Sequence, residues 1–304
     1  MMAPMPTPPE PTAAHPDLPR WTRALPANPI GPTSSRLIRA ATGLVKLIPD
    51  RHVETVAVSG TASVRLFGLR TPGTTTPALV WMHGGGYVIG TARQDDAICR
   101  TYAERLGLLV ASVEYRLAPD HPYPAGLEDC YAALTWLAKQ PTVDPARIVV
   151  AGASAGGGLA ATLVNLAHDR GEVAPAFQLL VYPMLDDRTV DSPPERAGSH
   201  HLWSARSNVY GWSAYLGDAD RAAAVPARRA DLAGLPPTWI GVGTHDLFHD
   251  EDLAYARRLA DAGVPVETEV VPGAFHAFDV FASRTAVARS FVDSQIAAVR
   301  RVLG

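Results

Sequence analysis

From residue 78 onward the chain alternates between short apolar runs and longer segments in which apolar residues recur at helical spacing. The runs are Ala78–Met82, Leu108–Val113, Ile148–Ala151, Gln178–Tyr182, Thr238–Val242 and Val266–Val271. The helical segments lie near Asp95–Leu106, Leu127–Lys139, Ala155–His168, Asp250–Ala262 and Thr285–Leu303. Near-continuous apolar strands are buried on both faces, so the pattern predicts an α/β protein with a parallel sheet between two layers of helices.

Two further regions frame this repeating unit. Ahead of it, Ser34 and Ser35 are candidate N-caps of an amphipathic helix. Val53–Val58 and Ser63–Leu69 then alternate partly between apolar and polar residues and are predicted to pair as strands. Residues 186–235 interrupt the rhythm with Arg, Ser, Pro and aromatic residues, which indicates an insertion that lies over the sheet.

Composition narrows the class of protein. The chain has 304 residues, 47% hydrophobic and 19% charged, which is enough apolar material for one large α/β domain. Its 27 Lys and Arg residues nearly balance 30 Asp and Glu residues, and a net charge of −3 gives no reason to expect nucleic acid as a partner. Two cysteines, Cys99 and Cys130, are too few for a disulfide framework or a Cys-rich zinc site.

Two stretches could be mistaken for targeting or membrane segments. Residues 1–33 hold ten of the 27 prolines and no apolar run, which predicts a mobile tail ahead of a single domain over residues 34–304. The uncharged stretch from Ile148 to Ala167 is long enough to cross a bilayer, but its glycines divide it into a strand, a turn and a helix. We therefore expect no membrane span and a cytoplasmic protein.

A candidate nucleophile stands in the turn after the third apolar run. Gly152-Ala153-Ser154-Ala155-Gly156 matches G-x-S-x-G between a strand and a helix. A serine hydroxyl becomes a nucleophile when it is raised above the sheet beside a base. A turn tight enough to raise it leaves room only for glycine at its flanks. A plain connecting turn could carry the same residues, so the interpretation depends on finding an acid, a base and an oxyanion site.

The oxyanion site is predicted in the loop after the first run, where His83-Gly84-Gly85-Gly86 stands. Successive glycines let backbone N–H groups turn toward a ligand, and such donors stabilise the alkoxide that forms in acyl transfer. Gly84 and Gly85 are the expected donors, with Ala155 as a third, whereas His83 is expected to fix the loop by hydrogen bonding. Neither phosphate-binding pattern, G-x-x-x-x-G-K-[ST] or G-x-G-x-x-G, is present.

The acid and the base are predicted in the turns after the last two runs. Asp246 follows the fifth run and His276 follows the sixth. The carboxyl ends of parallel strands meet at one edge, so both side chains are expected near Ser154. His276 is the predicted base and Asp246 the carboxylate that orients it. Asp250 and Glu251 have the plainer interpretation of solvating or capping the next helix.

The acid segment also allows a metal-site interpretation. His245 and His249 flank Asp246 at i and i+4, which resembles H-E-x-x-H with Asp in place of Glu. That pattern binds zinc only when both histidines share one helix face and a third ligand is near. The segment lies at the exit of a strand, so we expect no metal.

Together these motifs resemble the hormone-sensitive-lipase family of α/β-hydrolases, which includes bacterial carboxylesterases with an HGGG loop. Three further segments carry the likeness: Glu114–Ala125 (EYRLAPDHPYPA), Val181–Asp186 (VYPMLD) and Asp246–Glu251 (DLFHDE). The likeness spans roughly residues 35–303. Ala153 and Leu247 depart from it, because the family more often has Asp or Thr at the first position and Pro at the second.

The resemblance implies an α/β-hydrolase fold, with an eight-stranded, mostly parallel sheet, helices on both faces and a helical cap from about residues 34–50 and 186–235. It implies hydrolysis of short- to medium-chain acyl esters by Ser154, Asp246 and His276 through an acyl-enzyme, without a cofactor. The partner it implies is a small-molecule ester, and it suggests a homodimer.

Residues on both sides of the predicted site are expected to form the substrate pocket. They are Tyr87, Val88, Tyr182, Leu202, Trp203, Trp212 and Tyr215, although ordinary packing of a cap would use the same residue types. Two other functions stay open. One is an amidase or lactonase with the same triad, and the other is a receptor-like relative that binds a small molecule without a catalytic base. Retention of His276 argues against the receptor.

Overall fold

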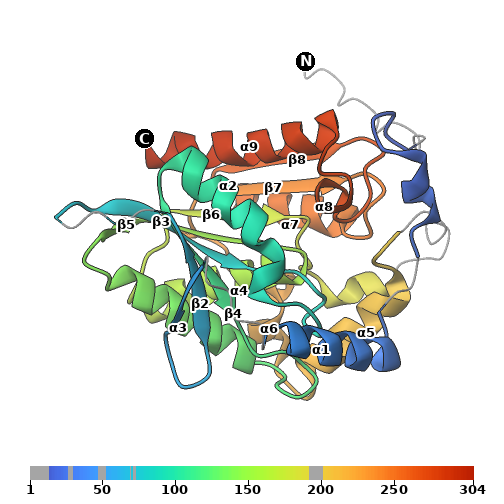
Figure 1. Cartoon of the computed structure of the whole chain (residues 1–304), viewed down its shortest axis with the longest axis horizontal. Coiled ribbons are helices and arrows are strands. Elements are labelled where there is room, and N and C mark those ends of the chain that lie inside the picture. Colours follow the sequence, from blue (N-terminus) through green and yellow to red (C-terminus); the bar gives the residue numbers. More distant parts are fainter. Residues whose placement is uncertain (1–13, 27–29, 47–52, 69, 71–72, 192–200) are drawn as a thin grey trace.

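The apolar runs form the centre of one twisted sheet in the computed structural model, which describes residues 14–26, 30–46, 53–68, 70, 73–191 and 201–304 (Figure 1). The strands are β1 (Glu54–Ala57), β2 (Ser63–Phe67), β3 (Thr76–Met82), β4 (Leu109–Glu114), β5 (Val143–Ala153), β6 (Phe177–Val181), β7 (Thr238–Gly243) and β8 (Val266–Val271). Their order is β1-β2-β4-β3-β5-β6-β7-β8, and only the pairs β1–β2 and β2–β4 are antiparallel. The predicted eight-stranded, mostly parallel sheet is confirmed.

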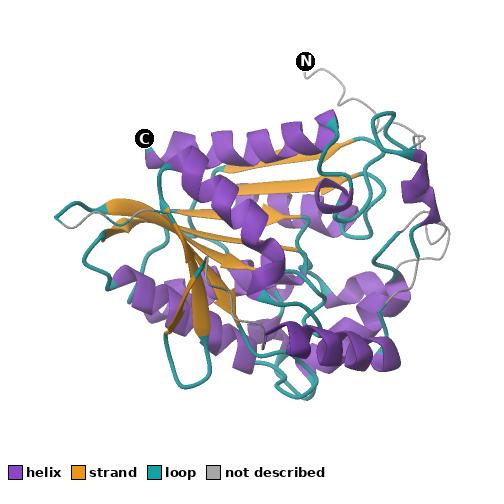
Figure 2. Ribbon diagram, viewed as in Figure 1, coloured by secondary structure: helices purple, strands orange, loops and turns teal. Residues whose placement is uncertain are grey.

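Alternate residues of each central strand enter two different cores. In β3, Val80 and Met82 belong to one core, whereas Leu79 and Trp81 belong to the other. The long helices that cover the two faces are α2 (Asp96–Leu106), α3 (Ala125–Ala138), α4 (Ala155–Arg170), α7 (His249–Asp261) and α9 (Ala286–Leu303). Buried residues of α3, α4 and α7 share the core of Val80, and those of α2 and α9 share the core of Leu79 (Figure 2).

The N-terminal segment differs from the expected mobile tail wherever the structure describes it. Residues 20–24 form a short 3₁₀ helix, η1 (Arg20–Ala24), beside the buried side chains of Leu18 and Thr22. The N–H of His15 donates to the carbonyl of Gly273 over 3.1 Å. The prediction of a mobile tail is therefore wrong for residues 14–26, while residues 1–13 lie outside the described part of the chain.

The first long helix also starts earlier than its two serines suggest. Helix α1 (Pro32–Lys46) begins at Pro32, because proline has no N–H to lose and its fixed φ suits the first helical position. Ser34 instead accepts a hydrogen bond from the N–H of Gly31, and Ser35 donates to the carbonyl of Pro32.

The described part of the insertion after β6 is mostly helical and lies next to the N-terminal segment. Its elements are η3 (Asp187–Asp191), α5 (Ala205–Leu216), α6 (Arg221–Ala224) and η5 (Pro226–Arg228). Ser207 donates to the carbonyl of Ile30 over 2.9 Å, and the hydroxyl oxygens of Ser35 and Tyr210 lie 2.8 Å apart. Figure 1 shows α1 beside α5 accordingly, so the two segments predicted to form a cap lie together.

The uncharged stretch that begins at Ile148 forms the end of β5, a turn and most of α4. Within the residues that the structure describes, no helix has the length and apolar character needed to cross a membrane.

Leu18→Ala tests whether the N-terminal segment packs onto the domain. The Leu18 side chain is only 8% exposed, so its truncation should lower the free energy of unfolding by about 2–3 kcal/mol, measured by urea denaturation. Arg23→Ala changes an exposed position of η1 and serves as the control, with little effect expected. Equal stability of Leu18→Ala and the control would contradict the packing.

Candidate active site

Ser154 occupies the single-residue turn between β5 and α4. Its backbone angles, φ 57° and ψ −124°, lie in a region that residues with a side chain rarely adopt and that costs about 1–3 kcal/mol. Three hydrogen bonds hold it there. The N–H of Ser154 donates to Val181 over 2.9 Å, and its carbonyl accepts from the N–H groups of Gly158 and Met184. The turn is therefore fixed from the neighbouring strand and from its own helix.

The two flanking glycines are required by close backbone approaches. A Cβ atom on Gly152 would lie 2.3 Å from the carbonyl oxygen of Gly156. A Cβ atom on Gly156 would lie 2.1 Å from the carbonyl oxygen of Met82 and 2.4 Å from that of His83. The start of α4 thus packs directly against the end of β3, as the G-x-S-x-G spacing predicts.

The structure brings Ser154, His276 and Asp246 together in one chain of hydrogen bonds. The Nδ1 atom of His276 lies 2.8 Å from Oδ2 of Asp246, and its Nε2 atom lies 2.9 Å from Oγ of Ser154. Because a carboxylate only accepts, Nδ1 carries the proton, which leaves Nε2 free to accept from the serine hydroxyl. All three side chains are buried at the carboxyl edge of the sheet.

Backbone and aromatic contacts hold the acid and the base in place. The other carboxylate oxygen of Asp246 accepts from the N–H of Phe248 over 3.0 Å. The imidazole of His276 lies between two rings, with centroid distances of 5.2 Å to Phe248 and 4.9 Å to Tyr182, and both rings meet it edge-on. Phe248 was not predicted as a site residue, because the only signal for it in the sequence is its position in the DLFHDE segment.

The glycine loop lies directly beside Ser154. A Cβ atom on Gly84 would come within 3.3 Å of Cβ of Ser154. The carbonyl of Gly84 is hydrogen-bonded by Nδ1 of His83 and by Nε2 of Gln94, so the prediction that His83 fixes the loop is confirmed. Among the described residues, the N–H groups of Gly84 and Gly85 have no protein acceptor, and Ala155 is the first residue of α4.

The predicted pocket residues lie near this loop, mostly as buried packing partners. Tyr87 stacks on Tyr215 at 4.0 Å and touches Trp212 at 5.3 Å. A Cβ atom on Gly86 would overlap the six-membered ring of Trp203, so this indole packs directly against the loop. Val88 is fully buried, and Leu202 is half-buried with its N–H bonded to Pro26. Their role as pocket walls stays a prediction.

Comparison with known proteins places this geometry in a family. Residues 79–280 match a family profile described as the α/β-hydrolase fold, and carboxylesterase NlhH of Mycobacterium tuberculosis is 34% identical over 97% of this chain and 99% of its own. The chain belongs to the hormone-sensitive-lipase family of α/β-hydrolases. Esterase LipI of Mycobacterium tuberculosis is 39% identical over 75% of this chain and 73% of its own.

A solved structure in the family agrees with the fold. Esterase LipW from Mycobacterium marinum superposes with a TM-score of 0.81 at 32% identity, covering 96% of this chain and 98% of that one. The family resemblance and the α/β-hydrolase fold predicted from the sequence are both confirmed.

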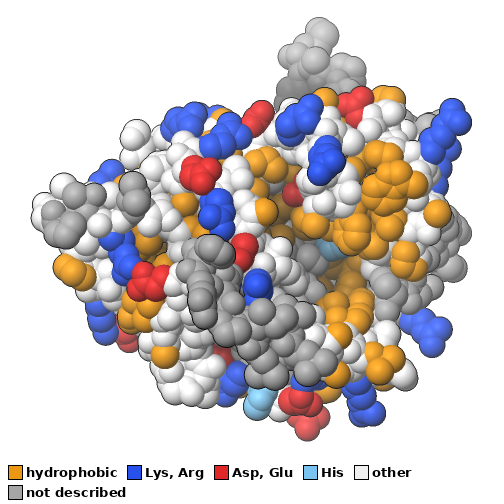
Figure 3. All heavy atoms as spheres, in the orientation of Figure 1, with side chains coloured by type: hydrophobic (Ala, Val, Ile, Leu, Met, Phe, Trp, Pro, Cys, Tyr) orange, Lys and Arg blue, Asp and Glu red, His pale blue; other side chains and the backbone are white. Residues whose placement is uncertain are grey.

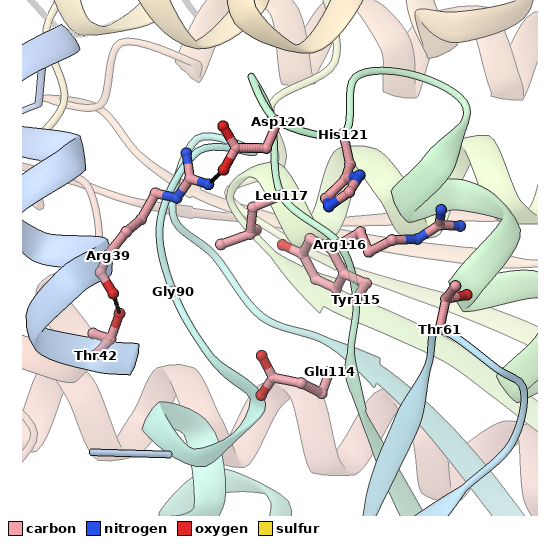
Figure 4. A pocket seen from close by; sticks show the side chains of 10 residues that line it. All are labelled: Arg39, Thr42, Thr61, Gly90, Glu114, Tyr115, Arg116, Leu117, Asp120 and His121. Atoms are coloured by element: carbon pink, nitrogen blue, oxygen red, sulfur yellow. Dashed lines mark hydrogen bonds and ion pairs between the residues drawn. The ribbon is translucent and has the colours of Figure 1, made fainter. Parts of the chain in front are cut away.

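The face drawn in Figure 3 is hollowed near its centre, and a histidine side chain is visible there among hydrophobic ones. A separate cavity of about 270 Å³ lies behind the glycine loop, lined by Gly90, Tyr115 and the ion pair of Arg39 with Asp120 (Figure 4). Tyr115 stacks on His83 at 4.2 Å and donates to the backbone carbonyl of His83, so this tyrosine supports the start of the glycine loop.

The expectation that Glu251 solvates or caps a helix is wrong. Its carboxylate is buried and accepts from the N–H groups of Leu185 and Asp186, over 2.6 and 3.1 Å, and from the hydroxyl of Thr189. Burial raises the pKa of Glu251 from 4.5 to about 8, although these hydrogen bonds oppose the shift. Glu251 therefore fixes the start of the insertion by hydrogen bonds, close to the loop that carries Asp246.

The geometry of the same segment does not fit the zinc-site interpretation, which needs His245 and His249 on one helix face. Helix α7 begins at His249, so His245 lies outside it and the two histidines share no helix face. His249 pairs with Asp250 instead. Among the described residues, no three His, Cys, Asp or Glu side chains come together as a metal site would require.

Gly156→Ala tests the close approach that fixes the nucleophile turn. The added methyl group would overlap two carbonyl oxygens, so we expect a loss of about 3 kcal/mol or more in the free energy of unfolding, with a large loss of activity. Gly60→Ala is the control, because no atom lies within 4 Å of its added Cβ. Similar melting temperatures for both variants would contradict the described packing.

Glu251→Gln tests the buried carboxyl. The folded protein keeps its proton up to about pH 8 whereas the unfolded chain releases it near 4.5, so stability falls as the pH rises through this window. This group alone should contribute a slope of roughly 1.4 kcal/mol per pH unit, which the neutral amide removes. Denaturation should show Glu251→Gln gaining on the wild type between pH 5 and 8, unlike exposed Glu104→Gln. Parallel curves for all three would refute the assignment.

Proposed function

We propose that this protein is a serine carboxylesterase that hydrolyses short- to medium-chain acyl esters. The hydrogen-bonded chain of Ser154, His276 and Asp246 carries the proposal, because it joins a nucleophile, a base and an orienting acid beside a glycine loop. Esterase is also the activity that the names of its relatives share. The geometry of the triad thus supports a mechanism for ester hydrolysis, the activity expected from the family.

The first half-reaction forms an acyl-enzyme. His276 accepts the hydroxyl proton of Ser154 at Nε2 while the serine oxygen attacks the ester carbonyl. Asp246 keeps the imidazole in the required tautomer and stabilises its positive form. The protonated His276 then gives its proton to the departing alcohol, which leaves the acyl group on Ser154.

The second half-reaction repeats these proton transfers with water as the nucleophile. In both, the substrate oxygen becomes negatively charged, and the N–H groups of Gly84, Gly85 and Ala155 are proposed to receive it. Loss of one such donor typically costs about 3 kcal/mol of transition-state stabilisation. Because every step is an acid–base or addition step among these groups, the proposed reaction needs no cofactor.

The same proposal extends to the substrate pocket, the cellular location and the oligomeric state. Trp203, lying on Gly86, is proposed to close the site beside the glycine loop and so to limit the acyl group. The hydrophobic side chains around the hollow in Figure 3 suit an uncharged ester. A cytoplasmic location remains a prediction with which the two buried, free cysteines agree, and the homodimer remains a prediction as well.

Ser154→Ala tests the proposed nucleophile. It should lower turnover of p-nitrophenyl esters by about 10³-fold or more and abolish labelling by a fluorophosphonate at that position, read by mass spectrometry. Ser213→Ala, on an exposed face of α5, is the matched control and should react normally. Near-normal esterase activity of Ser154→Ala would refute the mechanism. Anilide and lactone substrates in the same assay would separate an amidase or lactonase from an esterase.

A further inference from the structure

A second carboxylate lies close to the proposed base, and the mechanism above makes no use of it. Asp279 follows His276 by three residues and lies in the short helix α8 (Phe278–Phe281). Ala277, with φ 60°, turns the chain between them. This left-handed residue reverses the backbone at once after His276. Asp279 is partly buried, and Oδ1 of its carboxylate accepts from the hydroxyl of Tyr182 over 2.8 Å.

Tyr182 connects this carboxylate to the imidazole. The residue directly follows β6 with φ 35°, and its N–H donates to Gly241 over 2.7 Å, so its backbone is held in an unusual conformation. Its buried ring meets His276 edge-on, with planes inclined by 66°, and stacks on Phe291 of α9 at 6.3 Å. The ring therefore has neighbours in His276 and Phe291, while its hydroxyl donates to Asp279.

Asp279 has several titratable neighbours, and one of them is the proposed base, His276. Among the described residues, the titratable groups that interact with it include His276, Tyr182, Tyr102 of α2 and Asp95, which precedes α2. Asp95 accepts from the indole N–H of Trp81 over 2.7 Å, and burial raises its pKa to about 7. Among these groups only His276 can become positive.

Two opposing effects act on the charge of the Asp279 carboxylate. Burial raises the pKa of Asp279, while hydrogen bonds from Tyr182 and from the backbone N–H groups of Asp279 and Val280 oppose that rise. Such donors favour the charged form of a carboxylate. A negative charge at this place would stabilise a positive imidazole across a region of low dielectric.

We propose that Asp279 is a positioning residue for the base: through Tyr182 it fixes the imidazole of His276, and its charge stabilises the imidazolium that forms when Ser154 is activated. The proposal rests on the proposed triad. Asp246 supports the ring at Nδ1, in the plane of the proton transfer, whereas Asp279 and Tyr182 act on the ring from its side. The base would thus be supported by two carboxylates, Asp246 from the turn after β7 and Asp279 from helix α8.

Asp279→Asn is the decisive variant, since the amide oxygen can still accept from Tyr182 while the charge is lost. The readout is kcat/KM for one p-nitrophenyl ester from pH 5 to 9, with KM measured separately. We expect the midpoint of the acidic limb to move at least about half a pH unit lower, and kcat on the plateau to fall about three- to tenfold with KM unchanged. Tyr182→Phe keeps the ring and should move the limb in the same direction.

Asp293→Asn is the matched control, because it removes one carboxylate from an exposed position of α9 and should leave the profile unchanged. A limb of Asp279→Asn that coincides with the control, or a loss of activity by one factor at every pH, would overturn the proposal. If Asp279→Asn does not fold, the limb of Tyr182→Phe decides. Ser154→Ala separates the two ideas: when it is inactive but neither variant shifts the limb, only the role of Asp279 fails.

Discussion

The whole site depends on one close backbone approach between the start of α4 and the end of β3. Gly156 lies against the carbonyl oxygens of Met82 and His83, with no room for a side chain. The neighbouring strands β3 and β5 pair in register up to Met82 and Gly152, so the sheet itself sets this distance. The nucleophile and the glycine loop are therefore positioned by main chain, which is the least adjustable part of a protein.

Features that depend on local chemistry could be predicted from the sequence. The β8 strand was predicted from Val266 to Val271 and lies there. The strands β3, β5 and β7 contain their apolar runs, and β4 and β6 are displaced from theirs by one residue at each end. Ser154, Asp246 and His276 each lie in the turn or loop after a strand, so a parallel sheet brings them to one edge. The glycines of the nucleophile turn could be predicted as well, because a turn this tight has no space for larger side chains at its flanks.

Features that depend on what folds over a residue could not be predicted. Glu251 looks like a helix-surface residue until the chain near Leu185 closes over it. Tyr182 was expected in a pocket wall, a role that stays a prediction, but its edge-on contact with His276 was not visible in the sequence. The proline content of residues 1–33 suggested a mobile tail, but within it Leu18 and Thr22 are buried and His15 bonds to Gly273. In each case the deciding contact joins residues far apart in the sequence.

The hydrogen bond between Ile30 and Ser207, which are 177 positions apart, has a consequence for biosynthesis. A ribosome adds about 5–20 residues per second, so the N-terminal segment emerges roughly ten seconds or more before its partner in α5 exists. The bond from His15 to Gly273 must wait still longer, until the loop that carries His276 has been made. His15 and Ile30 thus gain these two contacts only after α5 and the loop of His276 have been made.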